Sequence, residues 1–456
     1  MKDKNDKSRQ HININEYWSK IRTQPLIWDT ITTTGWSTLG RGVGFLVPFF
    51  IAAWFGVTAE TDAFFFVYGL LLFISGVFAP VIENVIVPYI AEARAKGEDV
   101  GKFVGRILGV GSIGILALTA GVILVTKPVL SVLTRFDSQE LDLVYHLLIE
   151  TAPLIILLVW TSVLAGTLNA YQKFLFPAIS PAFRAIFNIG LIFIFKDILG
   201  VHAIALGYVI GEIFRIAILV GVIKRLKAFN LNLSFHLDNK LKEFLKTASY
   251  QTIGMVAVGL NPIVDKTMAS WLGSGSVSIL HYADMLYMVP LSFLCGGLFP
   301  VILSHWSKDY YQEGEHLFKK VRDASKAAFG VSLTILIILI LFSKPLVSLA
   351  FVRGKFYPKY SHILQLTFIC YLLGLIPYVA GSMFTRAHLC LKNTRFLMKL
   401  AFLNCFINAI LNYILMQFAG VAGIALSTSV TVIIVAILLF VSSLEKEKRG
   451  MVYGKI

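Results

Sequence analysis

Residues 63–91 read AFFFVYGLLLFISGVFAPVIENVIVPYIA. The stretch is apolar almost throughout, and Glu83 is its one acidic or basic side chain. An α-helix of roughly 20 apolar residues is long enough to cross the hydrocarbon core of a bilayer. Membrane β-strands are shorter, about ten residues, and they alternate in polarity. This continuous run therefore predicts a transmembrane helix and excludes a β-barrel.

Runs of the same kind recur along the chain. Hydrophobic types make up 57% of its 456 residues, charged types make up 15%, and the mean hydropathy is +0.75. This composition excludes a soluble multidomain enzyme, because soluble domains carry roughly 25% charged residues. We predict an all-α polytopic membrane protein with about twelve transmembrane helices. The expected spans are 28–56, 63–91, 105–126, 145–170, 177–196, 199–224, 244–272, 277–303, 325–344, 361–386, 396–416 and 418–443.

The positive charges indicate how these spans are oriented. With the N-terminus inside, the cytoplasmic segments carry 30 Lys and Arg residues and the opposite loops carry seven. Lys and Arg concentrate on the cytoplasmic side of membrane proteins. The sequence therefore predicts that both termini are cytoplasmic. The net charge of +15 is explained by attraction to anionic lipid headgroups, so membrane lipids are expected partners and nucleic acid is not.

The second half of the chain resembles the first half. Four short motifs recur in the same order at offsets of 215 to 220 residues. Each unit holds six spans, an even number, so both units have the same orientation in the membrane. This is the parallel-repeat plan of secondary transporters, which bind substrate between the halves. The pairs are Ala53–Gly56 with Ser270–Gly273, Lys127–Ser131 with Lys344–Ser348, Ala165–Thr167 with Ala380–Ser382, and Gly200–Leu206 with Gly420–Leu426.

The repeat divides the chain into five expected segments. The N-terminal segment is polar and basic and does not have the short apolar core of a signal peptide. The stretch between the two repeats is also polar, with no long apolar run. The segments are a cytoplasmic N-terminal segment (1–27), a first lobe with spans 1–6 (28–224), a cytoplasmic linker (225–243), a second lobe with spans 7–12 (244–443) and a cytoplasmic tail (444–456).

Basic side chains inside spans are candidates for substrate binding, because a charge there is costly unless it faces a cavity or a partner. Arg41 lies midway along its span, and a guanidinium suits phosphate recognition. A salt bridge to Glu83 or Asp62 is the alternative. Arg184 lies near the cytoplasmic end of its span, facing either a cavity or the interface. Lys266 is expected to face the cavity.

Acidic side chains inside spans are candidates for substrate contacts or ion coupling. Asp62 and Asp284 lie near the outer ends of their spans, either as helix caps or as cavity residues. Glu83 and Asp265 lie in the spans themselves. A carboxylate within the membrane can take up a proton or bind a cation, and this chemistry couples transport to an ion gradient. We therefore take Glu83 and Asp265 as candidates for ion coupling.

Two polar patterns favour a structural role. Glu212 and Arg215 are three residues apart on one expected helix, so their side chains can pair. Asn404, Asn408 and Asn412 follow one another at four-residue intervals on one face of the span 396–416. Such polar stripes more often join membrane helices by hydrogen bonds than bind ligands.

The sequence carries no enzyme signature. Its nine histidines are scattered, with no HExxH motif, and no GxxxxGK[ST] loop is present for nucleotide binding. We therefore expect no catalytic residues, no cofactor and no metal. Transport would then be driven by an ion gradient, the membrane potential or the supply of substrate.

Six stretches of the chain match a known family in order. They are Gly40–Phe45, Trp54–Gly56, Thr61–Phe65, Asp265–Leu272, Gly275–Asp284 and Gly354–Phe356. In these stretches the sequence resembles the MurJ/MviN lipid II flippases, and the resemblance covers most of the chain. It implies the fold of the multidrug/oligosaccharidyl-lipid/polysaccharide exporter superfamily, in which two six-helix lobes surround a central cavity.

The resemblance also implies a function. The expected protein is a flippase that moves a polyprenyl-pyrophosphate-linked glycan precursor by alternating access. Arg41 matches one of the family's phosphate-binding arginines, whereas Val47, Ser75 and Met285 stand at the positions of the others. Lipid II and a related cell-envelope glycan both remain open as the substrate. With Arg41, the residues expected to bind substrate are Lys266, Arg184, Asp62 and Asp284.

The setting follows from the same resemblance. We expect a monomer in the bacterial inner membrane, with envelope-biosynthesis enzymes as partners. An ion-coupled multidrug or metabolite exporter of the same fold is the main alternative. A non-transporting member of an envelope assembly complex is a further alternative.

Overall fold

The computed structural model describes residues 25–226, 230, 232–295, 317–391 and 393–453. All regular secondary structure in these ranges is helical. The helices of the first half are α2 (Pro25–Phe55), α3 (Ala59–Ala95), α4 (Val100–Leu133), α5 (Ser138–Ala170), α6 (Leu175–Leu199) and α7 (His202–Arg225). Those of the second half are α8 (Asn239–Gly259), α9 (Asn261–Ala269), η1 (Ser270–Leu272), α10 (Ser276–Cys295), α12 (Leu317–Leu341), α13 (Ser343–Phe351), η2 (Pro358–Tyr360), α14 (Ser361–Leu372), α15 (Leu375–Cys390) and α16 (Thr394–Tyr453).

The helices follow the expected spans, with ends that differ by a few residues. Each of α2 to α7 corresponds to one span, whereas the expected span 244–272 is broken into α8, α9 and η1. The last two spans lie in α16, which contains two helices joined at Gly420, where the backbone is not helical. Among the described residues, eight helices are long and apolar enough to cross a membrane. This number counts α16 as one helix, although it contains two.

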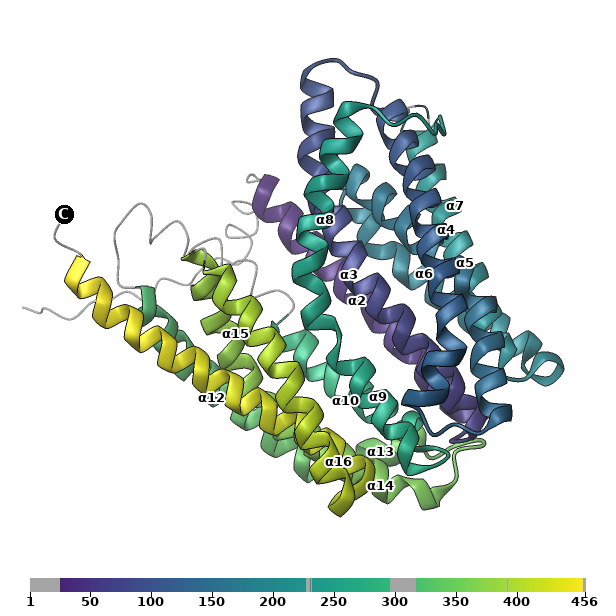
Figure 1. Ribbon diagram of the computed structural model, residues 1–456, viewed down its shortest axis with the longest axis vertical. Coiled ribbons are helices and arrows are strands. Elements are labelled where there is room, and N and C mark those ends of the chain that lie inside the picture. Colours follow the sequence, from purple (N-terminus) through teal and green to yellow (C-terminus); the bar gives the residue numbers. More distant parts are fainter. Residues whose placement is uncertain (1–24, 227–229, 231, 296–316, 392, 454–456) are drawn as a thin grey trace, which may run out of the picture.

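The helices form two groups that meet at one end of the molecule and diverge toward the other (Figure 1). The first group is α2–α7, and the second is α9–α16. Helix α8 belongs to the second half of the sequence but stands beside α3 (Figure 1). Its Phe244 ring meets the Tyr89 ring edge-on at 5.6 Å. We call the end where the two groups meet the closed end; it contains the α2–α3 turn, the α9–α10 connection and the α13–α14 connection.

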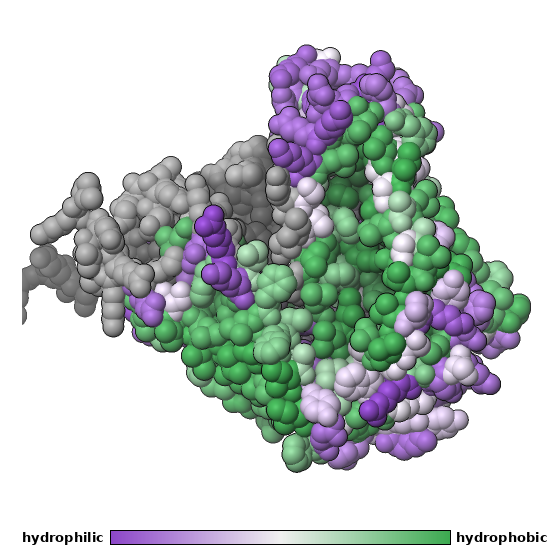
Figure 2. Space-filling view, viewed as in Figure 1, coloured by the Kyte–Doolittle hydropathy of each residue, from purple (hydrophilic) through white to green (hydrophobic). Residues whose placement is uncertain are grey.

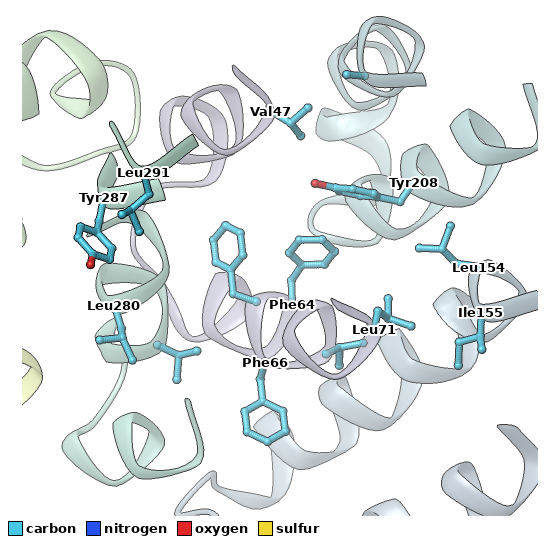
Figure 3. Close-up of a cluster of buried hydrophobic side chains, with 14 of the residues drawn as sticks. Val47, Phe64, Phe66, Leu71, Leu154, Ile155, Tyr208, Leu280, Tyr287 and Leu291 are labelled. Atoms are coloured by element: carbon cyan, nitrogen blue, oxygen red, sulfur yellow. The ribbon is translucent and has the colours of Figure 1, made fainter. Parts of the chain in front are cut away.

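Helix α3 lies at the centre of the apolar core. Phe64, Phe65 and Phe66 are consecutive, and each is at most 2% exposed. Consecutive side chains point about 100° apart around a helix, so their burial requires neighbours on several sides. Figure 3 shows Phe64 on the side of α3 that faces Tyr208 and Phe66 on the opposite side. Phe65 packs on the His281 ring of α10, with ring centroids 4.2 Å apart, so the buried residues of α3 connect both groups of helices.

The outer surface is apolar along the flanks of the molecule. Hydrophobic residues cover most of the flanks, and hydrophilic residues gather at the ends (Figure 2). Large side chains such as Val132 and Phe418 are more than 80% exposed. In water such a surface would aggregate, whereas the hydrocarbon chains of a bilayer cover it. The surface is therefore that of a membrane protein.

The segment before α8 lies against α4. Gly101, Gly105 and Gly109 share one face of α4, and a Cβ added at Gly105 would lie 1.7 Å from the carbonyl oxygen of Asn232. The Ser234 amide donates to the Gly105 carbonyl at 3.2 Å. Ion pairs join Arg106 to Asp238 and Lys240 to Glu98. Glycine is needed on this face of α4 because any side chain would push the segment away. The close contact between this segment and α4 holds the start of α8 to the first group.

Candidate functional site

Two glycine turns bring the backbones of the two groups into contact at the closed end. Gly56 (φ +75°) ends α2, and Gly354 (φ +60°) follows α13. A Cβ at Gly354 would lie 2.0 Å from the Ala53 carbonyl oxygen, and one at Gly56 would lie 2.4 Å from that of Lys355. The Lys355 amide donates to the Ala53 carbonyl at 2.8 Å. Both glycines therefore supply a left-handed backbone and the space for this contact.

Asp62, in the first turn of α3, caps helix α10 of the other group. Its carboxylate accepts hydrogen bonds from the backbone N–H of Gly275 (2.6 Å) and of Ser278 (2.7 Å), and from the Ser278 hydroxyl (2.5 Å). The side chain is only 1% exposed. Helix N-termini present unpaired N–H groups and partial positive charge, so a buried carboxylate is stable there. Of the two roles expected for Asp62, the structure shows the helix cap, and this cap joins the two groups.

Lys266, in α9, reaches across to α3. Its Nζ donates to the Phe65 carbonyl at 2.8 Å, and the side chain is almost fully buried. Gly69 makes room for it, because a Cβ there would lie 2.7 Å from the Lys266 Cδ. Asp284 and Asp265 act on the ammonium electrostatically. The ammonium thus lies between the two groups, and its expected contact with substrate stays a prediction.

Asp265 points away from its neighbour Lys266, toward α16. Its Oδ1 accepts from the side-chain amides of Asn408 (2.6 Å) and Asn412 (2.7 Å), and the Thr428 hydroxyl lies 3.3 Å from Oδ2. The expectation that Asn408 and Asn412 join helices is therefore confirmed. The carboxylate is enclosed by neutral polar groups within the second group of helices, and its expected role in ion coupling stays a prediction.

The first group contains a buried ion cluster around Glu212. This carboxylate is fully buried and accepts from Arg184 (3.0 Å), Arg215 (3.3 Å) and the Thr161 hydroxyl (2.6 Å). Arg215 also donates through Nε to the Ser180 hydroxyl at 2.9 Å. The predicted pairing of Glu212 with Arg215 is confirmed. Arg184, predicted to bind substrate, uses part of its guanidinium on Glu212, and 25% of its side chain stays exposed.

The other predicted positions are spread over three helices. Arg41 lies within α2, and its side chain is outside the described residues. Glu83 is half-buried on α3 and acts electrostatically on Arg215. Asp284 is half-buried on α10. Val47, at a position where the family resemblance predicted arginine, is 3% exposed and belongs to the apolar core (Figure 3).

The sequence did not reveal the neutral partners of these charged groups. Ser278 and the Phe65 carbonyl bind Asp62 and Lys266 across the junction, and Thr161 binds Glu212. One signal was available, because Thr61 and Ser278 are 217 residues apart, the same offset as the repeat, and their hydroxyls hydrogen-bond at 2.9 Å. Serine, threonine and backbone carbonyls are too common in membrane helices to be recognised otherwise.

The fold matches those of solved transporters. Over 91% of this chain and 87% of the other, it superposes on a lipid II flippase MurJ in an inward closed conformation, with a TM-score of 0.78 and 25% identity. It also matches the inward-facing conformation of a multidrug resistance MATE family transporter of the MOP superfamily, with a TM-score of 0.74 over 92% of this chain and 98% of that one. At 14% identity, the second match shows the fold alone. The protein therefore has the fold of a MOP-superfamily membrane transporter.

The sequence comparison narrows this class to one family. The model of the family "Lipid II flippase MurJ" matches residues 51–453. The probable lipid II flippase MurJ of Buchnera aphidicola subsp. Acyrthosiphon pisum (strain APS) is 27% identical over 427 residues, which cover 90% of this chain and 81% of the relative. This chain belongs to the lipid II flippase MurJ family.

Proposed function

We propose that this protein moves a polyprenyl-pyrophosphate-linked glycan precursor, lipid II or a related cell-envelope unit, across the cytoplasmic membrane by alternating access. Family membership supports the substrate class. The observation that carries the mechanism is the set of contacts that joins the two groups at the closed end. At the closed end the Asp62 carboxylate accepts hydrogen bonds from the start of α10, and Lys266 and the Lys355 amide donate across the junction, while the groups diverge at the other end (Figure 1). An alternating carrier opens one side while the other is shut.

We further propose that the chain has twelve spans, arranged as two six-helix lobes with both termini in the cytoplasm. The charge distribution supports this orientation. The repeat has a counterpart in the backbone, because Gly200 (φ 58°, ψ −137°) and Gly420 (φ 55°, ψ −131°) adopt nearly the same conformation 220 residues apart. In this topology the closed end faces outward, and the end at which the two groups diverge faces the cytoplasm.

In this inward-open state, Arg41 and Arg184 are our candidates for binding the substrate pyrophosphate. Arg184 presents five N–H donors, of which Glu212 occupies only part, and it remains partly exposed. Lys266 and Asp284 would join the site in the opposite state, because opening of the closed end separates the ammonium from the Phe65 carbonyl. Asp62 would be free to contact substrate only in that state, since α10 now occupies both of its oxygens.

Asp265 is our first candidate for ion coupling, and Glu83 is the second. A proton or Na⁺ at Asp265 would compete with the amide donors of Asn408 and Asn412, and so would alter the packing of α9 on α16. The same arrangement suits the alternative, an ion-coupled multidrug or metabolite exporter. Replacing Asp265 with Asn should therefore change how transport responds to an imposed ion gradient, measured in vesicles at constant substrate.

Arg41 variants test the proposed substrate. We expect Arg41→Ala to lower transport of a lipid-linked pyrophosphate glycan into vesicles by roughly tenfold or more, since a charge-assisted hydrogen bond contributes about 1.5–3 kcal/mol. Arg41→Lys should retain part of this activity while the protein inserts normally. Arg353→Ala removes an exposed arginine at the closed end and serves as the control.

The two functions predict different effects of Arg41→Ala on cationic drugs. If the protein is a glycan flippase, Arg41→Ala should lower glycan transport and leave the extrusion of cationic drugs unchanged. If Arg41→Ala leaves both the abundance and the glycan transport of the protein unchanged, the phosphate-binding role of Arg41 is wrong.

We expect the protein to work as a monomer in the bacterial inner membrane and to catalyse no bond cleavage. Its substrate would come from the enzymes that build lipid-linked glycans, which are the proposed partners. A reporter fused after residue 456 should report a cytoplasmic C-terminus, and light scattering in detergent should give the mass of one chain.

A further inference from the structure

A groove of about 660 Å³ lies on the flank of the molecule near the closed end, where α4, α9 and α16 meet. Leu133 lines it from the first group of helices. Ile263 and Met268 of α9 and Phe406 and Ile410 of α16 line it from the second group. Asp62, Lys266 and Lys355 do not line it. The groove is therefore a separate site that touches both groups of helices.

One end of the groove carries a tryptophan and a cation. The Trp271 indole N–H donates to the Leu133 carbonyl at 2.7 Å, and the Arg135 guanidinium lies 5.9 Å from the centroid of the Trp271 ring. Arg135 is exposed, and no carboxylate of the described residues forms an ion pair with it. Tryptophan and arginine are typical of the membrane interface. This end of the groove therefore lies at the membrane surface.

The rest of the groove runs from that surface toward the centre of the bilayer. It follows α16 from Ile414 back to Phe406, which is about 12 Å at 1.5 Å per residue, and it runs along η1 and α9 from Trp271 back to Ile263. The lining is apolar apart from the hydroxyls of Thr267 and Tyr413 and the Trp271 indole N–H, which is already bonded to the Leu133 carbonyl. The occupant that fits this lining is hydrocarbon along most of the groove and anionic at the Arg135 end.

We propose that this groove binds one anionic phospholipid of the outer leaflet, with an acyl chain along α9 and α16 and the phosphate against Arg135. An arginine donates well-oriented hydrogen bonds to phosphate oxygens, and apolar walls bind the chain. The placement in the outer leaflet rests on the topology proposed above. Because the lipid contacts both groups at the closed end, its binding stabilises the inward-open state.

Thermal unfolding of the delipidated, detergent-purified protein tests the site. Phosphatidylglycerol should raise the Tm by about 2 °C or more, and phosphatidylcholine should not. Ile410→Trp fills the groove and should abolish this shift, whereas Ile198→Trp, on the exposed surface of α6, should retain it. Arg135→Gln should remove the preference for phosphatidylglycerol. Lys359→Gln, which removes another cation above aromatic rings at this end, should not.

Three outcomes would overturn the proposal. They are equal stabilisation by phosphatidylcholine, an unchanged response in Ile410→Trp, and protection by a polyprenyl phosphate but not by phosphatidylglycerol. The last outcome would assign the groove to the carrier lipid instead. None of these measurements depends on glycan transport, so the lipid site and the proposed function can fail separately.

Discussion

Asp62 shows how a single residue joins the two groups of helices. Its carboxylate is buried in an apolar environment, where an unpaired charge is strongly unfavourable. Three hydrogen bonds from the start of α10 compensate for the lost water, and the helix N-terminus adds favourable charge. The contact is therefore stable only while α10 stays against α3. When this end opens, the Asp62 carboxylate must instead accept hydrogen bonds from another residue or from water.

Asp62→Asn should weaken the closed end. An amide replaces one acceptor oxygen with an NH₂ group, which cannot accept from Gly275 or Ser278. We expect a loss of about 1–3 kcal/mol in the free energy of unfolding, the cost of leaving a buried donor unpaired. The measurement is the urea or thermal unfolding curve, with Asp142→Asn in an exposed ion pair as the control. Equal stability of the two variants would contradict this account.

Glu212→Gln should be more damaging, because it leaves two partly buried arginines without their shared, fully buried carboxylate. Removing one member of a buried ion pair typically costs about 3–5 kcal/mol. We therefore expect a large fall in the abundance and the Tm of the inserted protein. Glu150→Gln is the matched control, since Glu150 pairs with His202 at a partly exposed position. A variant that stays as abundant as this control would show that the cluster is hydrated rather than structural.

At the scale of elements, the segment before α8 packs tightly on α4, so the two are expected to move together. The three glycines on α4 allow a backbone-to-helix approach that no side chain would permit. The ion pairs of Arg106 and Lys240 fasten the same segment at its far end. Helix α8 is thereby held to the first group, although α9, which follows it, packs with the second. The break at Leu260 between α8 and α9 is therefore where relative movement of the groups would be absorbed.

Gly105→Ala tests this attachment. The added methyl would lie 1.7 Å from the Asn232 carbonyl oxygen, a backbone atom, so the segment must move away from α4. We expect faster cleavage of residues 230–238 in limited proteolysis. Gly111→Ala, on the same helix with nothing within 4 Å, is the control and should stabilise α4 by up to about 1 kcal/mol. Equal cleavage rates would show that the segment is not held by this contact.

At the scale of the whole molecule, the polar contacts that join the two groups gather at the closed end within the part of the chain that the structure describes. Backbone contacts, the Asp62 cap and the Lys266 hydrogen bond all lie at or near the closed end. Such contacts are strong enough to define a state yet few enough to be exchanged for others. This is the kind of junction that the proposed alternating access requires.

Crosslinking the closed end should arrest transport. Cysteines introduced at Ala53 and Lys355 lie on segments whose backbones hydrogen-bond at 2.8 Å. In a variant without native cysteines, a short thiol-specific crosslinker should join them efficiently and reduce glycan transport to background. Each single-cysteine variant, treated in the same way, should retain its activity. Transport that continues at the normal rate after complete crosslinking would rule out opening at this end.

The sequence by itself determined the helical class and the approximate positions of the long apolar helices, although not the breaks within the span 244–272. Long apolar runs fold as helices in a membrane wherever they occur, because no water is present to satisfy the backbone. It also determined the pairing of Glu212 with Arg215, since residues three apart share one face of a helix. Membership of the family followed from motifs such as Thr61–Phe65. All of these features depend on residues that are close in the chain.

Only the tertiary structure decided which partners the charged residues have. Asp62 binds Gly275, 213 residues away, and Lys266 binds the Phe65 carbonyl, 201 residues away. A buried polar group must be paired, but the pattern of one helix does not reveal which side of it meets which neighbour. That choice is made when all the helices pack together. For this reason Lys266, expected to face a cavity, lies between two helix groups, and its partner is a backbone carbonyl that no sequence motif marks.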